Sequence, residues 1–110
     1  MKTFDVFNCQ PPDWKEPHPA VIVSHPDRSA RKPVVEVIMC STARANRSPE
    51  PGEILLDKED GLDWETICFC DLIYAVRRDD LKARRGEVSE ARRGHLVRTI
   101  IAAHRWADVL

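Results

Sequence analysis

Two side chains in the sequence, an imidazole and a carboxylate, are the leading candidates for proton transfer. His18 precedes a proline and an apolar run, and its imidazole can act as a general acid or a general base. Asp71 interrupts the β-branched and aromatic run of residues 66–76, where an unpaired buried charge would cost several kcal/mol. Its carboxylate must therefore be paired, protonated or placed at a wet cleft. In a cleft it can serve as a base or orient His18, whereas a solvated loop histidine and a satisfied strand carboxylate are the structural alternatives.

A hydroxyl pair and two arginines follow one another further along the chain. Ser41 and Thr42 come at the end of an apolar run, and their hydroxyl groups can donate hydrogen bonds to a phosphate oxygen or cap the end of a strand. Arg44 and Arg47 lie in the loop 42–51 that follows. Because long loops in small domains are often functional, these arginines can supply cations to a site, or they can form a solvated surface.

The formal net charge of −1 conceals a segregation of charge along the chain. Residues 25–48, which include Arg28 and Arg31, carry five Arg or Lys against two acids, and residues 77–98 carry eight against four. Residues 50–65 between them carry seven acids and one Lys. The two basic segments could meet as a phosphate-binding patch, or they could remain solvated surface.

Short apolar runs separated by polar turns predict the elements that position these side chains. We expect strands at residues 3–8, 20–25, 34–41, 52–56, 66–76 and 85–88, and an amphipathic helix that begins after Ser89. In the strand at 66–76, alternation predicts a core face. Its members are Cys68, Cys70, Leu72, Tyr74 and Val76. The pattern predicts a small, curled, mostly antiparallel sheet or barrel with a C-terminal helix.

The cysteines, the chain length and the lengths of the apolar runs narrow the class of protein. The four cysteines, Cys9, Cys40, Cys68 and Cys70, contain no Cys-x-x-Cys pair, so we interpret them as small buried residues rather than zinc ligands. At 110 residues we expect one domain, and no apolar run is long enough to span a bilayer. Without a signal-peptide pattern at its start, the chain is expected to be cytoplasmic.

The order of four short motifs resembles the MazF/PemK (Kid) family of toxins from bacterial type II toxin–antitoxin systems. They are His-Pro-Ala-Val-Ile-Val-Ser from His18, Val-Ile-Met-Cys-Ser-Thr ending at Thr42, Cys-Asp-Leu-Ile around Asp71, and Gly-Glu-Val-Ser ending at Ser89. The resemblance implies an SH3-like β-barrel at about residues 3–88 and a helix at about 89–107, within a single domain spanning 1–110. It also implies a homodimer, a cognate antitoxin partner, and cleavage of single-stranded RNA without metal or cofactor.

Carried over position by position, the resemblance keeps some family residues and loses others. His18 stands where the family usually has an Arg before Pro, and Phe69 stands where it has the Arg of Arg-Cys-Asp. Asp71 and the pair Ser41-Thr42 match the family pattern. Metal-free RNA cleavage needs a base for the 2′-hydroxyl, an acid for the leaving 5′-oxygen and donors for the developing charge. The predicted catalytic residues are His18, Asp71, Ser41 and Thr42, and the predicted RNA-binding residues are Arg28, Arg31, Arg44, Arg47 and Phe69.

Two alternatives stay open at this level. Because both usual arginines are replaced, the chain could be a catalytically degenerate member of the fold that binds RNA or inhibits a protein such as DNA gyrase, as CcdB relatives do. It could also be a small β domain of another function. Phe69 could stack on a base, or it could form a hydrophobic patch with Ile67 and Ile73.

Overall fold

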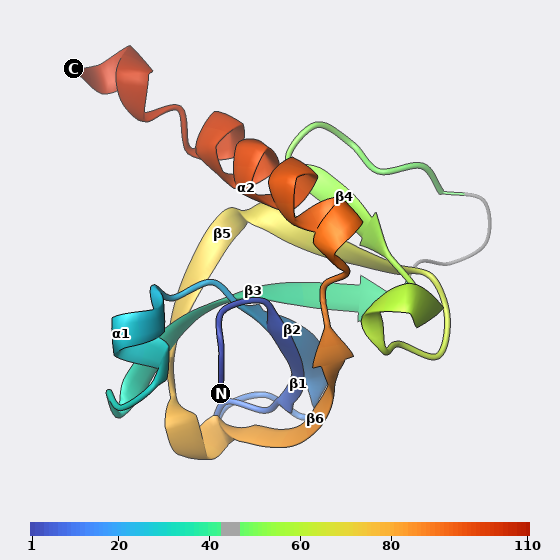
Figure 1. Ribbon diagram of the computed structural model, residues 1–110, viewed down its shortest axis with the longest axis vertical. Coiled ribbons are helices and arrows are strands. Elements are labelled where there is room, and N and C mark those ends of the chain that lie inside the picture. Colours follow the sequence, from blue (N-terminus) through green and yellow to red (C-terminus); the bar gives the residue numbers. More distant parts are fainter. Residues whose placement is uncertain (43–46) are drawn as a thin grey trace.

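The computed structural model describes residues 1–42 and 47–110 as a six-stranded antiparallel sheet with a C-terminal helix (Figure 1). The strands are β1 (Asp5–Cys9), β2 (His18–Ile22), β3 (Val34–Thr42), β4 (Glu53–Leu56), β5 (Thr66–Arg77) and β6 (Leu81–Glu87). The helices are α1 (Pro26–Ser29) and α2 (Glu90–His104), with 3-10 turns η1 (Lys58–Asp60), η2 (Arg78–Asp80) and η3 (Trp106–Val109). In space the strands follow the order β4-β5-β3-β2-β1-β6.

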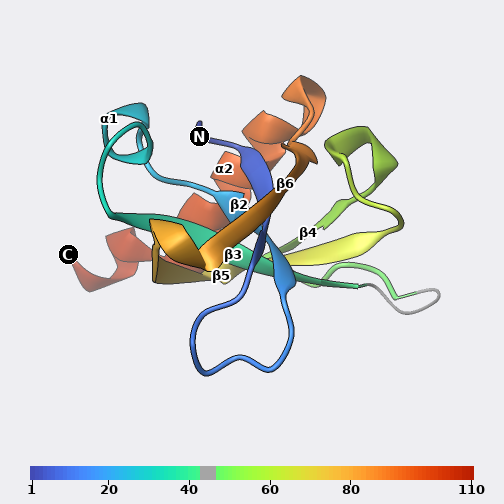
Figure 2. The same ribbon diagram turned by 90° about the horizontal axis from the view of Figure 1, so that it is seen from below.

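The sheet is strongly curled but open. The prediction of a mainly β fold with a C-terminal helix is confirmed, whereas the barrel is wrong: within residues 1–42 and 47–110 the edge strands β4 and β6 do not pair. Figures 1 and 2 show β1, β2 and β6 curving around one end of the molecule while α2 runs across the other. Helix α2 packs on β5 and on the edge strand β4, so it covers one face of the sheet at that edge.

One strand was hard to predict from the sequence. Strand β6 covers Leu81–Glu87, whereas only residues 85–88 were expected to be extended. Its burial pattern shows why, since the charged residues between Leu81 and Gly86 are mostly exposed and give no apolar alternation. As an edge strand paired only with β1, β6 tolerates the charges that a central strand would not. The connection between β2 and β3 contains the short helix α1, which the sequence analysis did not predict.

The central strands are apolar because both faces of the sheet are covered. On one face Ile38 and Leu96 of α2 belong to a core cluster, and on the other face Val37 and Met39 belong to a second cluster. These side chains are all less than 5% exposed. A nearly continuous apolar run along β3 is therefore required by burial on both sides. Among the described residues, no helix is long and apolar enough to cross a membrane.

The pairing of β3 with β5 is interrupted in the middle of both strands. Ile38 lies opposite Ile73, but two residues later Cys40 lies opposite Cys68. Four residues of β5 therefore pass the single β3 residue Met39. Such a bulge bends the longer strand, and Figure 1 shows β5 turning sharply at this point.

The bend changes which side chains of β5 point together. Cys68, Cys70 and Val76 are buried, but they do not share one face. Cys68 and Cys70 belong to the core cluster of Ile38, whereas Val76 belongs to the cluster on the other face. Leu72 and Tyr74 were expected in the same core face, but Leu72 is 51% exposed and Tyr74 is only partly buried. This part of the prediction is wrong because the extra residues in the bulge shift the alternation.

Two cysteines form a bond that the sequence analysis did not predict. Cys40 and Cys68 are cross-strand partners with Cα atoms 4.1 Å apart, and a disulfide joins them. The interpretation of all four cysteines as free buried residues is therefore wrong for this pair and confirmed for Cys9 and Cys70. A separation of 28 residues does not indicate a pairing, because only the register of β3 with β5 brings the two thiols together.

The acidic segment and the second basic segment meet in ion pairs. Arg92 of α2 lies 2.5 Å from Asp60 Oδ2 and 2.7 Å from Asp57 Oδ1. Asp60 is fully buried, and it also accepts the backbone N–H groups of Asp57 and Ser89. Arg85 of β6 pairs with Asp63 of the same acidic segment. Part of the segregation of charge along the chain is therefore used to fix η1 against α2 and β6.

We expect Arg92→Ala to lower the free energy of unfolding by about 3 kcal/mol, because it leaves the buried Asp60 carboxylate without its cation. Arg92→Ala should also make the free energy of unfolding depend less on pH in the acid range. The Arg92 guanidinium holds the pKa of Asp57 below its usual value, so this stabilisation is present above pH about 4 and is lost as pH falls. Urea denaturation between pH 3 and 7 measures both effects, with the exposed Arg98→Ala as control. Equal stability of the two variants would contradict the prediction.

Candidate functional site

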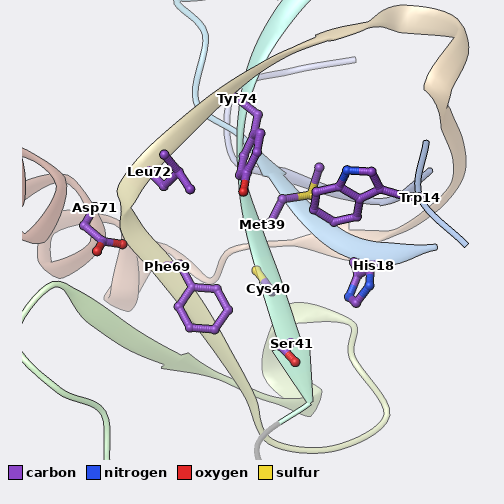
Figure 3. Close-up of a pocket in the computed structure, with 9 residues that line it drawn as sticks. All are labelled: Trp14, His18, Met39, Cys40, Ser41, Phe69, Asp71, Leu72 and Tyr74. Atoms are coloured by element: carbon purple, nitrogen blue, oxygen red, sulfur yellow. The ribbon is translucent and has the colours of Figure 1, made fainter. Parts of the chain in front are cut away.

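A cavity of about 470 Å³ lies beside the bend of β5 (Figure 3). It is lined by residues from the β1–β2 loop and from β2, β3 and β5. They are Trp14, His18, Met39, Cys40, Ser41, Phe69, Asp71, Leu72 and Tyr74. Four of the predicted site residues are therefore brought together here from three strands, namely His18, Ser41, Phe69 and Asp71.

The two titratable candidates come from different walls of this cavity. His18 is the first residue of β2, and Asp71 lies in the bulged part of β5. Figure 3 shows them on opposite sides, with the ring of Phe69 between them in that view. No hydrogen bond joins His18 to Asp71 among the contacts of the described residues, so direct orientation of one by the other is not supported. The arrangement suits a molecule that lies between them.

Aromatic rings form much of the remaining wall. Trp14 contacts His18 edge-on with ring centroids 5.2 Å apart, and it contacts Tyr74 in the same manner at 5.7 Å. The Gln10 side-chain amide holds the Trp14 loop by donating to the carbonyl oxygens of Trp14 and Lys15 at 3.1 and 3.2 Å. Trp14 and Tyr74 were not among the predicted site residues. The available signal was a tryptophan in a proline-rich loop just before His18.

Thr42 does not share the cavity with Ser41. Successive side chains of a strand point to opposite faces, and the Thr42 hydroxyl accepts a hydrogen bond from Trp64 Nε1 at 3.1 Å. It lines a smaller, neighbouring cavity of about 210 Å³. Its predicted catalytic role therefore lacks support from position.

Two of the predicted arginines that the structure describes, Arg28 and Arg31, lie away from the cavity. Arg28 belongs to α1, beside the start of β3, and it pairs with Glu36 at 3.1 Å. Arg31 follows α1 in the same exposed connection. Ser41 lies at the other end of β3, so both arginines are distant from it along the strand. Arg44 lies outside the described residues.

Among the predicted arginines that the structure describes, Arg47 is the one whose contacts place it near the cavity. Its Nη2 lies 2.9 Å from both carboxylate oxygens of Glu53, and Glu53 is the cross-strand partner of Phe69. The hydrogen bond from Arg47 holds the pKa of Glu53 below its usual value. Direct cross-strand partners project on the same face of a sheet, so this ion pair flanks the Phe69 wall.

The chemistry of the cavity is that of an apolar, aromatic pocket with few polar groups. An imidazole, a carboxylate and a hydroxyl provide an acid, a base and a hydrogen-bond donor. In the ranges 1–42 and 47–110, no three His, Cys, Asp or Glu side chains are clustered so as to hold a metal ion. Pockets with apolar walls and a few convergent polar groups are typical ligand sites.

Fold and cavity together define a small curled β-sheet protein with an aromatic cavity that carries an imidazole, a carboxylate and a hydroxyl group. A sequence model of the PemK-like, MazF-like toxins of type II toxin–antitoxin systems matches residues 2–103. The chain therefore belongs to this toxin family. Comparison with curated proteins finds no match.

Several solved structures have the same fold. An endoribonuclease in complex with its cognate antitoxin, from a mycobacterial species, superposes with a TM-score of 0.79 at 22% identity, covering 94% of this chain and 93% of that one. The Mycobacterium tuberculosis toxin MazF-mt6 superposes with a TM-score of 0.76 at 18% identity. The match covers 90% of this chain and 94% of that one. The MazE–MazF structure from Deinococcus radiodurans superposes with a TM-score of 0.70 at 10% identity. The match covers 93% of this chain and 92% of that one.

We expect the two free thiols to be unreactive in the folded protein. Burial, with the nearby Asp80 carboxylate, raises the pKa of Cys9 to about 11, and burial, with the adjacent Asp71 carboxylate, raises that of Cys70 to about 12. At pH 8, iodoacetamide should label neither, since the thiolate is the reactive form. Mass spectrometry should find two labels after unfolding without reductant and four after unfolding with reductant. Four labels without reductant would contradict the Cys40–Cys68 bond.

Proposed function

We propose that this chain is a toxin that cleaves single-stranded RNA without a metal ion. The observation that carries the proposal is the convergence of His18, Ser41 and Asp71 on one cavity. Membership of the MazF-like toxin family and the fold shared with mycobacterial endoribonucleases support it. The alternative, a degenerate protein that binds RNA or inhibits DNA gyrase, is not favoured by these comparisons.

In the proposed reaction the two walls of the cavity handle different protons. The exposed carboxylate of Asp71 takes the proton of an RNA 2′-hydroxyl, and the 2′-oxygen attacks the adjacent phosphorus. The bond from phosphorus to the 5′-oxygen breaks, and His18 on the opposite wall protonates that leaving oxygen. The Ser41 hydroxyl donates to a non-bridging phosphate oxygen as charge develops there. The separation of His18 from Asp71 across the cavity supports two roles rather than a relay.

The same cavity offers surfaces for RNA bases. Phe69, Trp14 and Tyr74 present aromatic rings, and base–aromatic stacking accounts for much of the affinity in single-strand recognition. Arg47 beside the Phe69 wall supplies a cation for a phosphate, in place of the usual family arginines. Stacking therefore compensates for the scarcity of positive charge.

We further propose a homodimer and a cognate antitoxin as protein partners. The exposed side of α2 and the residues after it carry large apolar side chains that face solvent in the isolated chain. They are Val97, Ile101, Trp106, Val109 and Leu110. Exposed apolar patches of this kind commonly mark protein interfaces.

Purified protein should cleave a long single-stranded RNA equally well with and without EDTA. His18→Ala and Asp71→Asn should each reduce the cleavage rate about 100-fold or more, because each removes one proton-transfer step. His95→Ala and Asp79→Asn change exposed residues outside the cavity and are the matched controls. RNA that stays intact with wild-type protein, while a control ribonuclease digests it, would refute the proposed activity.

We expect Trp14→Ala to weaken binding of a 2′-O-methyl RNA oligonucleotide by about tenfold, the size of one lost base–aromatic contact. Trp14→Phe should restore most of the affinity, because it keeps an aromatic face. Trp64→Ala, which removes an exposed tryptophan outside this cavity, is the control. Fluorescence anisotropy measures the dissociation constants, and equal losses for Trp14→Ala and Trp64→Ala would argue against a stacking role.

A further inference from the structure

The Cys40–Cys68 disulfide forms part of the wall of the candidate site. Cys40 lines the cavity between Met39 and Ser41, and Cys68 directly precedes Phe69 on the facing strand. Figure 3 shows the Cys40 sulfur between Phe69 and Met39. The bond therefore connects the strand that carries Ser41 to the strand that carries Phe69 and Asp71.

The backbone ladder between β3 and β5 is short at this point, whereas β4 holds the other edge of β5, pairing Glu53 with Phe69 and Ile54 with Cys68. The β3–β5 ladder is interrupted just before Cys40, and the bulged segment of β5 that carries Phe69 and Asp71 has no regular partner on β3. Beyond the interruption the described residues form three pairs, those of Cys40, Ser41 and Thr42 with residues 66–68. The disulfide is the one covalent link between the two walls in the described part of the chain. Because ladder ends open readily, the distance between the β3 wall and the β5 wall depends on this link together with the three remaining pairs.

We propose that Cys40 and Cys68 form a reversible thiol–disulfide site that sets the shape of the cavity, and that the oxidised form binds RNA more tightly than the reduced form. This inference rests on the proposed RNA-binding function of the same cavity. Its partners in exchange are small disulfides and thiols of the glutathione class. Because Cys40 lines the cavity but is only 1% exposed, they reach its sulfur when the end of the β3–β5 ladder opens.

The exchange balances with such a partner. The Cys40 thiolate attacks one sulfur of a small disulfide, a mixed disulfide forms, and one small thiolate leaves and takes up a proton. The Cys68 thiolate then attacks the Cys40 sulfur and releases the second small thiol. Two electrons pass from the protein to the small disulfide, and reduction by two small thiols reverses both steps.

The other two cysteines are poorly placed for this chemistry. Cys9 lies in the core cluster on the opposite face of the sheet. Cys70 is buried, and its sulfur lies 3.9 Å from the carbonyl oxygen of Cys68. Neither lines the cavity. A variant without Cys9 and Cys70 should therefore keep the response, and it provides a matched control.

Reduction should leave the protein folded while loosening the site. Both sulfurs belong to apolar surroundings that remain intact as thiols, with Cys40 1% and Cys68 0% exposed. Ser41 would then move more freely relative to Phe69 and Asp71. If only part of the molecules have the cavity in the conformation that binds RNA, the apparent affinity for RNA is multiplied by that fraction.

The test compares wild-type protein equilibrated with oxidised or reduced glutathione, its state read by alkylation and mass spectrometry. Fluorescence anisotropy with a labelled, mixed-sequence 2′-O-methyl RNA 20-mer, used at the same salt concentration, gives the dissociation constant. We expect it to rise about fivefold or more on reduction, the lower end of typical couplings between sites. Cys40→Val/Cys68→Val should resemble the reduced form in both buffers, and Cys9→Ala/Cys70→Ala should respond as the wild type does.

A second measurement reports on the cavity without RNA. In the background Trp64→Phe/Trp106→Phe, Trp14 is the remaining tryptophan, and acrylamide should quench its fluorescence more strongly after reduction. Equal quenching and equal RNA affinity in the oxidised and reduced states, with reduction verified by mass, would overturn the inference. A change of RNA affinity between the two buffers that persists in Cys40→Val/Cys68→Val would also overturn it. A redox-dependent quenching together with absence of RNA cleavage would instead refute the proposed ribonuclease and leave the thiol–disulfide site standing.

Discussion

The interruption of the β3–β5 ladder is the constraint on which the site depends. Regular pairing would place Asp71 and Leu72 on opposite faces of β5, but both line the cavity because extra residues pass Met39 at the bulge. The same irregularity brings Tyr74 to the wall formed with Trp14. A cavity at this point is thus a consequence of mismatched strands, held at its edge by a cross-strand disulfide.

The charges of the chain mainly stabilise the fold. Arginines from the second basic segment pair with acids of the segment before it, most closely where Arg92 meets Asp57 and the buried Asp60. Arg78 donates to the backbone carbonyls of Ser29 and Lys32 and so ties the α1 connection to the end of β5. In the described part of the chain, charge that looked available for a phosphate patch is therefore largely paired within the molecule.

The family resemblance implies arginines at the positions of Phe69 and His18. In this chain the Phe69 ring lines the cavity, and His18 contacts Trp14 edge-on. An imidazole can transfer a proton, whereas a guanidinium cannot be deprotonated in proteins. Under the proposed function, the cavity therefore supplies acid–base chemistry and holds a nucleic acid mainly through aromatic surfaces.

Sequence alone determined the elements with strong local signals. The apolar, β-branched runs fixed β3 and β5, the spacing after Ser89 fixed α2, and the isolated carboxylate marked Asp71 as a candidate residue. Tertiary structure decided what depends on contacts between distant segments: the open sheet, the charged edge strand β6, and the disulfide. It also decided which neighbours face the cavity, so that Ser41 enters it and Thr42 does not. The reason is that strand register and bulges arise from packing between strands, and no local pattern of residue types encodes them.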